Sequence, residues 1–154
     1  MATHRSPDPV PQALLPHAAI ERFAEHAVLM SGYALRQARE LFDAVLRVAE
    51  AAPWRHMVTP GGLTMSVAMT NCGQVGWVTD RHGYRYTDTD PEGGRYWPAI
   101  PARMKALASK AADAAGFADF EPDACLVNRY EPGNRLSLHQ DRNERDFSAP
   151  VVSV

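Results

Sequence analysis

The sequence predicts an α+β fold in which helices come first and a run of antiparallel strands follows. Apolar residues recur every three or four positions in segments 31–52 and 101–115, as they do in amphipathic helices. From 63 to 70 they alternate with polar residues, which is typical of a strand. Residues 1–17 are rich in proline and predict an extended arm. We expect residues 18–154 to belong to a single domain.

The length of 154 residues, with 45% hydrophobic and 22% charged residues, is that of one globular domain. The net charge of −2 excludes a basic field over the whole molecule, so any nucleic-acid site must be local. Cys72 and Cys125 are the only cysteines, which excludes a disulfide scaffold and a four-cysteine zinc site. We interpret both as buried or half-buried small residues. The sequence has neither an apolar run long enough to span a membrane nor a secretory signal, so we expect a cytoplasmic protein with no membrane partner.

Turn and cap residues bound the expected elements. Ser31 is the expected N-cap of the first helix and Pro53 its stop, while Pro101 opens the second helix and Gly116 caps it. A turn at 59–62 precedes the first alternating strand.

Two further segments predict a first hairpin. A turn at 80–83 would pair Trp77 with Tyr86 and Thr79 with Tyr84. The three aromatic side chains would then share one face of the hairpin. Taken alone, such a face is more typical of sheet packing than of a binding surface. The loop that follows, with Asp88, Asp90 and Glu92, is interpreted as a solvated acidic loop.

A second hairpin is expected around a type II turn at Pro132-Gly133, where glycine supplies a positive φ. This turn would pair Asn128 with Ser137 and Leu126 with His139. One face would then carry polar side chains, namely Asn128, Tyr130, Ser137, His139 and, if the strand continues, Asp141.

The pair His139 and Asp141 has the spacing of two metal ligands on one strand. In an extended chain their side chains lie about 6–7 Å apart at the backbone, so both can bind one cation. A non-haem iron site needs two histidines and one carboxylate. By itself, this short pattern is more often a solvated strand end than a metal site.

Several motifs together resemble the AlkB family of Fe(II)- and 2-oxoglutarate-dependent dioxygenases, over about residues 20–154. They are Asn128-Arg129-Tyr130, Pro132-Gly133, the segment 136–141, and upstream 57–62, 64–73, Gly76-Trp77 and 122–126. The resemblance implies a double-stranded β-helix (jelly-roll) core preceded by a nucleotide-recognition lid. It implies oxidative dealkylation of N-alkylated bases in DNA or RNA, with Fe(II) as metal and 2-oxoglutarate as cosubstrate.

The resemblance also implies roles for individual residues. His139 and Asp141 would be iron ligands, and Asn128, Arg129 and Tyr130 would contact 2-oxoglutarate. The substrate would be contacted by Trp77, Tyr84, Arg85, Tyr86, Met65, Met69 and Asn143. Arg81 and Arg85 are candidate phosphate contacts beside the aromatic face, and stacking on an extruded base suits that face. For Met65 and Met69, packing in the core is the competing interpretation.

The sequence departs from the family pattern at two points. Asn143 stands where the family has an acidic residue that helps to read the base, and asparagine also donates hydrogen bonds. In the family, the second iron histidine and the arginines that bind 2-oxoglutarate follow at positions beyond Val154. We therefore expect the N-terminal part of a monomeric enzyme, with incomplete jelly-roll strands and little activity alone. The alternatives are a 2-oxoglutarate dioxygenase acting on a small molecule or protein, and a non-catalytic nucleic-acid-binding module.

Overall fold

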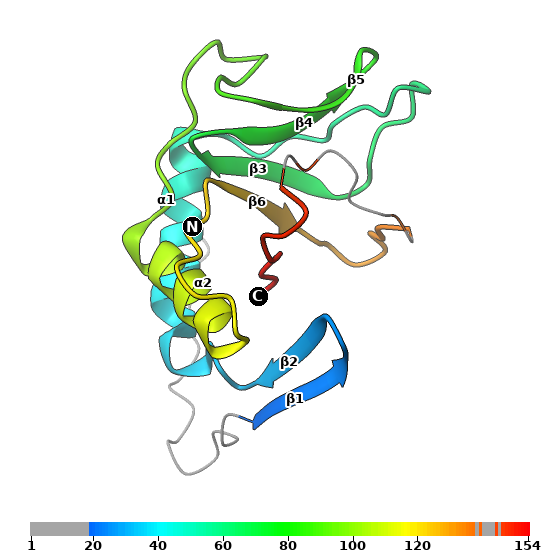
Figure 1. The fold of residues 1–154 in the computed structure, drawn as a ribbon. Coiled ribbons are helices and arrows are strands. Elements are labelled where there is room, and N and C mark those ends of the chain that lie inside the picture. The colour runs from blue at the N-terminus through cyan, green and yellow to red at the C-terminus, as the bar shows by residue number, and fades with distance from the viewer. Residues whose placement is uncertain (1–18, 138, 140–143, 145) are drawn as a thin grey trace. The chain divides into compact units, whose positions relative to one another are not determined.

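A computed structural model of the chain describes residues 19–137, 139, 144 and 146–154 (Figure 1). The arm predicted for residues 1–17 lies outside the described residues. The chain divides after Ala38 into two compact units, which are described separately below.

The first unit contains a hairpin that the sequence analysis missed. Strands β1 (Ala19–Ala24) and β2 (Ala27–Ser31) pair antiparallel, and a short 3-10 helix, η2 (Leu35–Gln37), follows. The expectation that helices come first, with Ser31 as N-cap, is therefore wrong. Ser31 pairs with Ala19 as the last residue of β2, and Gly32 then adopts a left-handed φ of 72°, which interrupts the chain before a helix can begin.

The helices of the second unit end where the sequence predicts. Helix α1 (Ala38–Ala51) ends just before Pro53, and helix α2 (Ala102–Ala114) follows Pro101. Gly116 has a φ of 99°, and its N–H donates to the carbonyl of Asp113 at 2.9 Å. The N–H of Phe117 donates to the carbonyl of Ala112 at 2.9 Å, which completes a Schellman cap.

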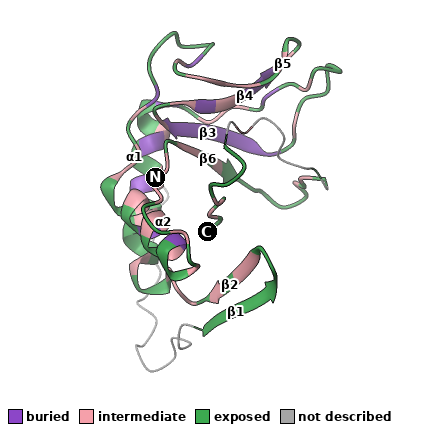
Figure 2. Cartoon of the chain, viewed as in Figure 1, coloured by how far each residue is buried: buried purple, intermediate pink, exposed green. Residues whose placement is uncertain are grey.

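Four strands form the second unit's two small antiparallel sheets. They are β3 (Ala68–Gly73), β4 (Gly76–Asp80), β5 (Gly83–Thr87) and β6 (Ala124–Arg129). β3 pairs with β6 and β4 with β5, and Figure 1 shows the order β5, β4, β3, β6 with α1 and α2 at one side. β3 is the most buried strand (Figure 2). With helices interspersed among antiparallel strands, the α+β class stands. No helix among the described residues is long and apolar enough to cross a membrane.

The register of the first predicted hairpin is confirmed. β4 and β5 pair Trp77 with Tyr86 and Thr79 with Tyr84, and Asp80 with Gly83 at the turn. The side chains of Trp77, Tyr84 and Tyr86 consequently share one face.

The second predicted hairpin is wrong in its strand pairing. The turn itself forms, because Gly133 has a φ of 91° and the N–H of Asn134 donates to the carbonyl of Glu131 at 2.9 Å. Beyond the turn, however, residues 135–137 form no strand with β6. The Ser66 hydroxyl donates to the carbonyl of Arg135 at 3.1 Å, so the chain leaves the turn toward another segment.

β6 instead pairs with the buried strand β3. Asn128 lies opposite Met69, and Leu126 lies opposite Asn71. The two strands are more than 50 residues apart in the sequence, and a pattern analysis of a local hairpin does not detect such pairing.

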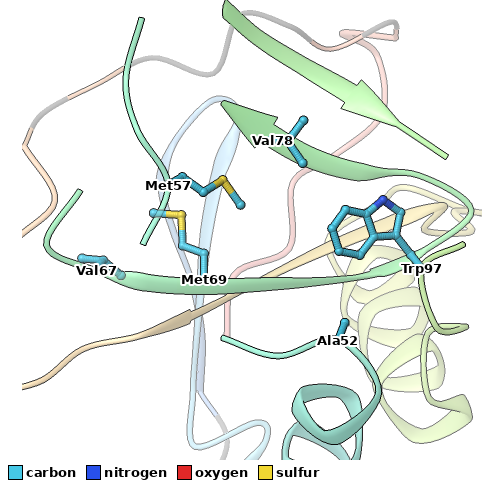
Figure 3. Packing of buried hydrophobic residues seen from close by; sticks show 6 residues of the cluster. All are labelled: Ala52, Met57, Val67, Met69, Val78 and Trp97. Carbon is cyan, nitrogen blue, oxygen red and sulfur yellow. The ribbon is translucent and has the colours of Figure 1, made fainter. Parts of the chain in front are cut away.

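A buried cluster lies between β3, β4 and the loops around them. Its members are Ala52, Met57, Val67, Met69, Val78 and Trp97 (Figure 3). Met65, Trp77 and Leu136 pack against it from partly buried positions. The hairpin that carries the aromatic face is therefore anchored on the core through Val78 and Trp77.

Candidate functional site

The aromatic face of the β4–β5 hairpin is the first part of the candidate site. The rings of Trp77 and Tyr84 stack with their centres 5.7 Å apart and an interplanar angle of 24°. Trp77 is half-buried against the core, whereas Tyr84 is 46% exposed. The core thus fixes the ring of Trp77. The ring of Tyr84 stacks on Trp77 and presents aromatic surface to solvent.

Asn71 holds the backbone of Trp77 in place. Its fully buried side chain donates from Nδ2 to the carbonyl of Trp77 at 2.8 Å and accepts the Trp77 N–H at Oδ1 at 3.0 Å. These two bonds satisfy a buried amide and fasten β4 to β3 where no ladder joins them. Gly76 allows this approach, since a Cβ there would lie 2.6 Å from the indole of Trp97 and 2.7 Å from Cβ of Asn71. Sequence analysis quoted both residues within the family motifs but did not assign them this anchoring role.

Tyr86 connects the hairpin to the segment that follows His139. Its hydroxyl donates to Oε1 of Glu144 at 2.7 Å, across 58 positions of sequence. The aromatic face is therefore a neighbour of Glu144, which follows His139 by five positions in the sequence. Sequence analysis did not single out Glu144.

His139 is exposed, and its Nδ1 lies 2.9 Å from the carbonyl oxygen of Ser137. Because a carbonyl oxygen only accepts, Nδ1 carries the hydrogen, and the lone pair of the neutral ring is on Nε2. Histidines that bind metals are commonly oriented in this way. Asp141 lies outside the described residues, and within the described part of the chain no group of three or more His, Cys, Asp or Glu side chains could hold a metal ion. Metal binding by His139 and Asp141 therefore stays a prediction. The orientation of the His139 ring is compatible with it.

The predicted 2-oxoglutarate contacts lie at the end of β6. Asn128 and Arg129 are its last residues, Tyr130 follows, and all three are exposed. Arg129 forms an ion pair with Glu131. Their role toward 2-oxoglutarate stays a prediction.

Arg85 lies on the opposite face of β5 from Tyr84 and Tyr86, because it pairs with Val78. Its guanidinium binds the carboxylate of Asp80, with Nη1–Oδ1 at 3.0 Å and Nη2–Oδ2 at 2.8 Å. The hydrogen bonds from Arg85 lower the pKa of Asp80 to about 2. A contact between Arg85 and substrate stays a prediction, and the ion pair would compete with it.

The two methionines differ in exposure. Met69 is 1% exposed and belongs to the core cluster, while Met65 packs against that cluster from a partly buried position. The structure thus accounts for Met69 as a core residue, and substrate contact by either methionine stays a prediction. Asn143, the expected base-reading position, lies outside the described residues.

The loop interpreted as a solvated acidic loop contains a buried ion pair, so that interpretation is wrong for Asp90. Asp90 is 8% exposed, and both its carboxylate oxygens bind the guanidinium of Arg55. These hydrogen bonds lower the pKa of Asp90 to about 2. The guanidinium also lies 5.5 Å from the ring centre of Trp97, and Nε of Arg55 is buried without a hydrogen-bond partner in the described structure. The pair therefore holds the 90–97 loop against the core beneath β4.

Comparisons with known proteins place this chain in a family. Residues 26–154 match the model of the 2OG-Fe(II) oxygenase superfamily, and the chain belongs to that superfamily. It is 55% identical over 134 residues to the alpha-ketoglutarate-dependent dioxygenase AlkB of Salmonella typhimurium and 53% identical to that of Escherichia coli. Each alignment covers 87% of this chain and 62% of the relative.

A more distant similarity extends to a human protein. The nucleic acid dioxygenase ALKBH1 of Homo sapiens is 34% identical over 77 residues, covering 50% of this chain and 20% of the relative. The predicted resemblance to AlkB proteins is confirmed, and Fe(II) and 2-oxoglutarate are the cofactors that the superfamily's name implies.

Proposed function

We propose that this chain serves in the oxidative dealkylation of N-alkylated bases in DNA or RNA, as part of an Fe(II)- and 2-oxoglutarate-dependent dioxygenase. The observation that carries the proposal is the stacked pair Trp77–Tyr84, on the face where Tyr86 binds Glu144, in a chain of this superfamily. The chain spans 62% of the length of its two AlkB relatives, so the activity is proposed for an enzyme that contains these residues. A monomeric state and a cytoplasmic location belong to the same proposal.

The aromatic face would bind the base. Tyr84 offers an exposed ring supported from below by Trp77. A base reaches such a ring only when it is single-stranded or turned out of the duplex. Alkylation of a ring nitrogen can leave a positive charge on the base, which favours an aromatic face. The carboxylate of Glu144, oriented by Tyr86, would add a negative charge beside it.

The metal would be held by Nε2 of His139 and by the carboxylate of Asp141, with Asn128, Arg129 and Tyr130 toward 2-oxoglutarate. Bound Fe(II), with oxygen and 2-oxoglutarate, would supply the oxidation of the alkyl group, which leaves as an aldehyde. The contact of Nδ1 with the carbonyl of Ser137 supports this proposal, because it would leave Nε2 as the nitrogen that coordinates the metal.

Binding to a single-stranded oligonucleotide with one N-methylated base tests the proposed surface. Tyr84→Ala should raise the Kd by about fivefold or more, because stacking of one base contributes about 1–3 kcal/mol. Tyr96→Ala is the matched control, since Tyr96 is 78% exposed and outside the hairpin. Equal affinities for the two variants would remove the support for this surface.

The reaction is tested by succinate release with Fe(II), 2-oxoglutarate and the methylated oligonucleotide, in the enzyme that contains these residues. Release should depend on the oligonucleotide and should fall in Trp77→Ala. If release did not depend on the oligonucleotide, a small molecule or protein would be the better substrate class, and if Trp77→Ala left the oligonucleotide-dependent release intact, the proposed contact of Trp77 with the base would be wrong.

A further inference from the structure

Cys72 and Cys125 lie directly opposite each other on the paired strands β3 and β6. Both are free thiols, of which Cys72 is fully buried and Cys125 half-buried. No other cysteine exists in the chain, so any intramolecular disulfide must join these two.

The backbone spacing at this pair suits a disulfide. Met69 exchanges both of its backbone hydrogen bonds with Arg55, on the side of β3 away from β6. The backbone N–H and C=O groups of successive residues point to opposite sides of a strand. Cys72 is three positions after Met69, so its N–H and C=O point toward β6, and it forms a hydrogen-bonded pair with Cys125. The Cα atoms of such a pair lie about 5.5 Å apart. That spacing falls within the range of about 4.4–6.8 Å that disulfides span.

We propose that Cys72 and Cys125 form a redox modification site, which closes into a cross-strand disulfide when hydrogen peroxide or a similar small peroxide reaches Cys125. This inference is independent of the proposed function, because it needs neither iron nor nucleic acid.

The reaction has two steps. The Cys125 thiolate attacks one peroxide oxygen, the O–O bond breaks, and the departing hydroxide takes a proton to become water, which leaves a sulfenic acid. Cys72 then loses its proton, its sulfur attacks the Cys125 sulfur, and the S–O bond breaks with release of a second water. Two electrons pass from the two thiols to the peroxide.

The environment assigns these two roles. The side chain of Cys125 is partly exposed, so a small peroxide can reach its sulfur. Cys72 is fully buried, which keeps its sulfur from direct contact with the oxidant. The half-buried Cys125 therefore meets the oxidant, and the fully buried Cys72 resolves the sulfenic acid.

The test oxidises the folded chain with hydrogen peroxide in the presence of a metal chelator, followed by intact-mass and peptide mass spectrometry. The expected product is a monomer that has lost two hydrogen atoms and both titratable thiols, with Cys72 and Cys125 in one linked peptide pair. Cys72→Ser should stop at a sulfenic acid on Cys125 that a dimedone-type probe traps. Cys125→Ser should keep its buried Cys72 thiol.

A second comparison shows whether the fold is responsible. The disulfide should form faster in the folded chain than in the chain unfolded by urea, because the pairing of β3 with β6 holds the two cysteines opposite each other. The proposal is overturned if the folded chain keeps both thiols, if the two cysteines oxidise separately to sulfinic acids, or if urea does not slow closure.

Discussion

The buried pair Arg55–Asp90 permits a sharp prediction about stability. Asp90→Asn keeps the size of the side chain and removes its charge, which leaves the guanidinium of Arg55 without its counter-charge. The side chains of both residues are 11% exposed, so solvent screens the pair little. Nε of Arg55 is already buried without a hydrogen-bond partner among the described residues, so the loss of Asp90 is not offset there.

The magnitude follows from the pKa of Asp90, which is lowered from 3.8 to about 2. A shift of that size corresponds to about 2 kcal/mol in the free energy of unfolding. Breaking a buried ion pair by removal of one partner typically costs about 3–5 kcal/mol. We expect Asp90→Asn to lower the free energy of unfolding by about 2–4 kcal/mol at pH 7, measured by urea unfolding.

The pH dependence provides a second readout of the same pair. The folded-state pKa lies below the unfolded value, so between the two the unfolded chain binds more protons. The contribution of Asp90 is complete above about pH 4 and is lost as the pH falls through about 2. Asp80 titrates in the same window, so the difference between the wild-type chain and Asp90→Asn isolates Asp90.

The matched control is Asp88→Asn, which removes an exposed carboxylate two positions earlier. Its effect should stay within about 0.5 kcal/mol, as for most surface substitutions. If Asp90→Asn and Asp88→Asn lowered stability equally, the assignment of Asp90 as a buried structural ion pair would be refuted.

Two further predictions concern the anchoring of the hairpin. Gly76→Ala should lower the free energy of unfolding, measured in urea, by about 1–3 kcal/mol, because the added Cβ would meet the indole of Trp97 at 2.6 Å. Gly61→Ala is the control, since its Cβ would lie 3.9 Å from the nearest neighbour and should change the free energy of unfolding little. Equal effects of the two substitutions would contradict the close packing at Gly76. Asn71→Ala should lower the free energy of unfolding by about 1–3 kcal/mol, because the backbone N–H and C=O of Trp77 lose their partners. It should also weaken the near-UV circular dichroism of the stacked Trp77 ring. An unchanged spectrum would show that Asn71 does not position that ring.

The first hairpin could be predicted from the sequence to the individual residue pair. Asp80 and Gly83 bound a short turn, and once a turn is fixed, strand alternation decides that Trp77 lies opposite Tyr86. The stacking of Trp77 on Tyr84 follows from the same register, because diagonal neighbours on one face are within reach of aromatic rings.

The second hairpin could be predicted only as far as its turn. Pro132 and Gly133 specify the turn conformation locally, but the partner of β6 is chosen by burial against β3. The same limit applies to the candidate site. The motif proposes His139 as a metal ligand, and that role stays a prediction, whereas the bond between Tyr86 and Glu144 joins residues 58 positions apart and has no local signal.

The sequence by itself determined the features that depend on neighbouring residues: the C-terminal ends of α1 and α2, the turns, the aromatic face, and the motifs that resemble the superfamily. Dihedral preferences, caps and the two-residue strand period act within a few positions of the chain. Only the tertiary structure decided the pairing of β3 with β6, the burial of Asp90 with Arg55, and the opposition of Cys72 and Cys125. Each of these joins segments at least 35 positions apart, and their association depends on which surfaces the whole fold removes from water.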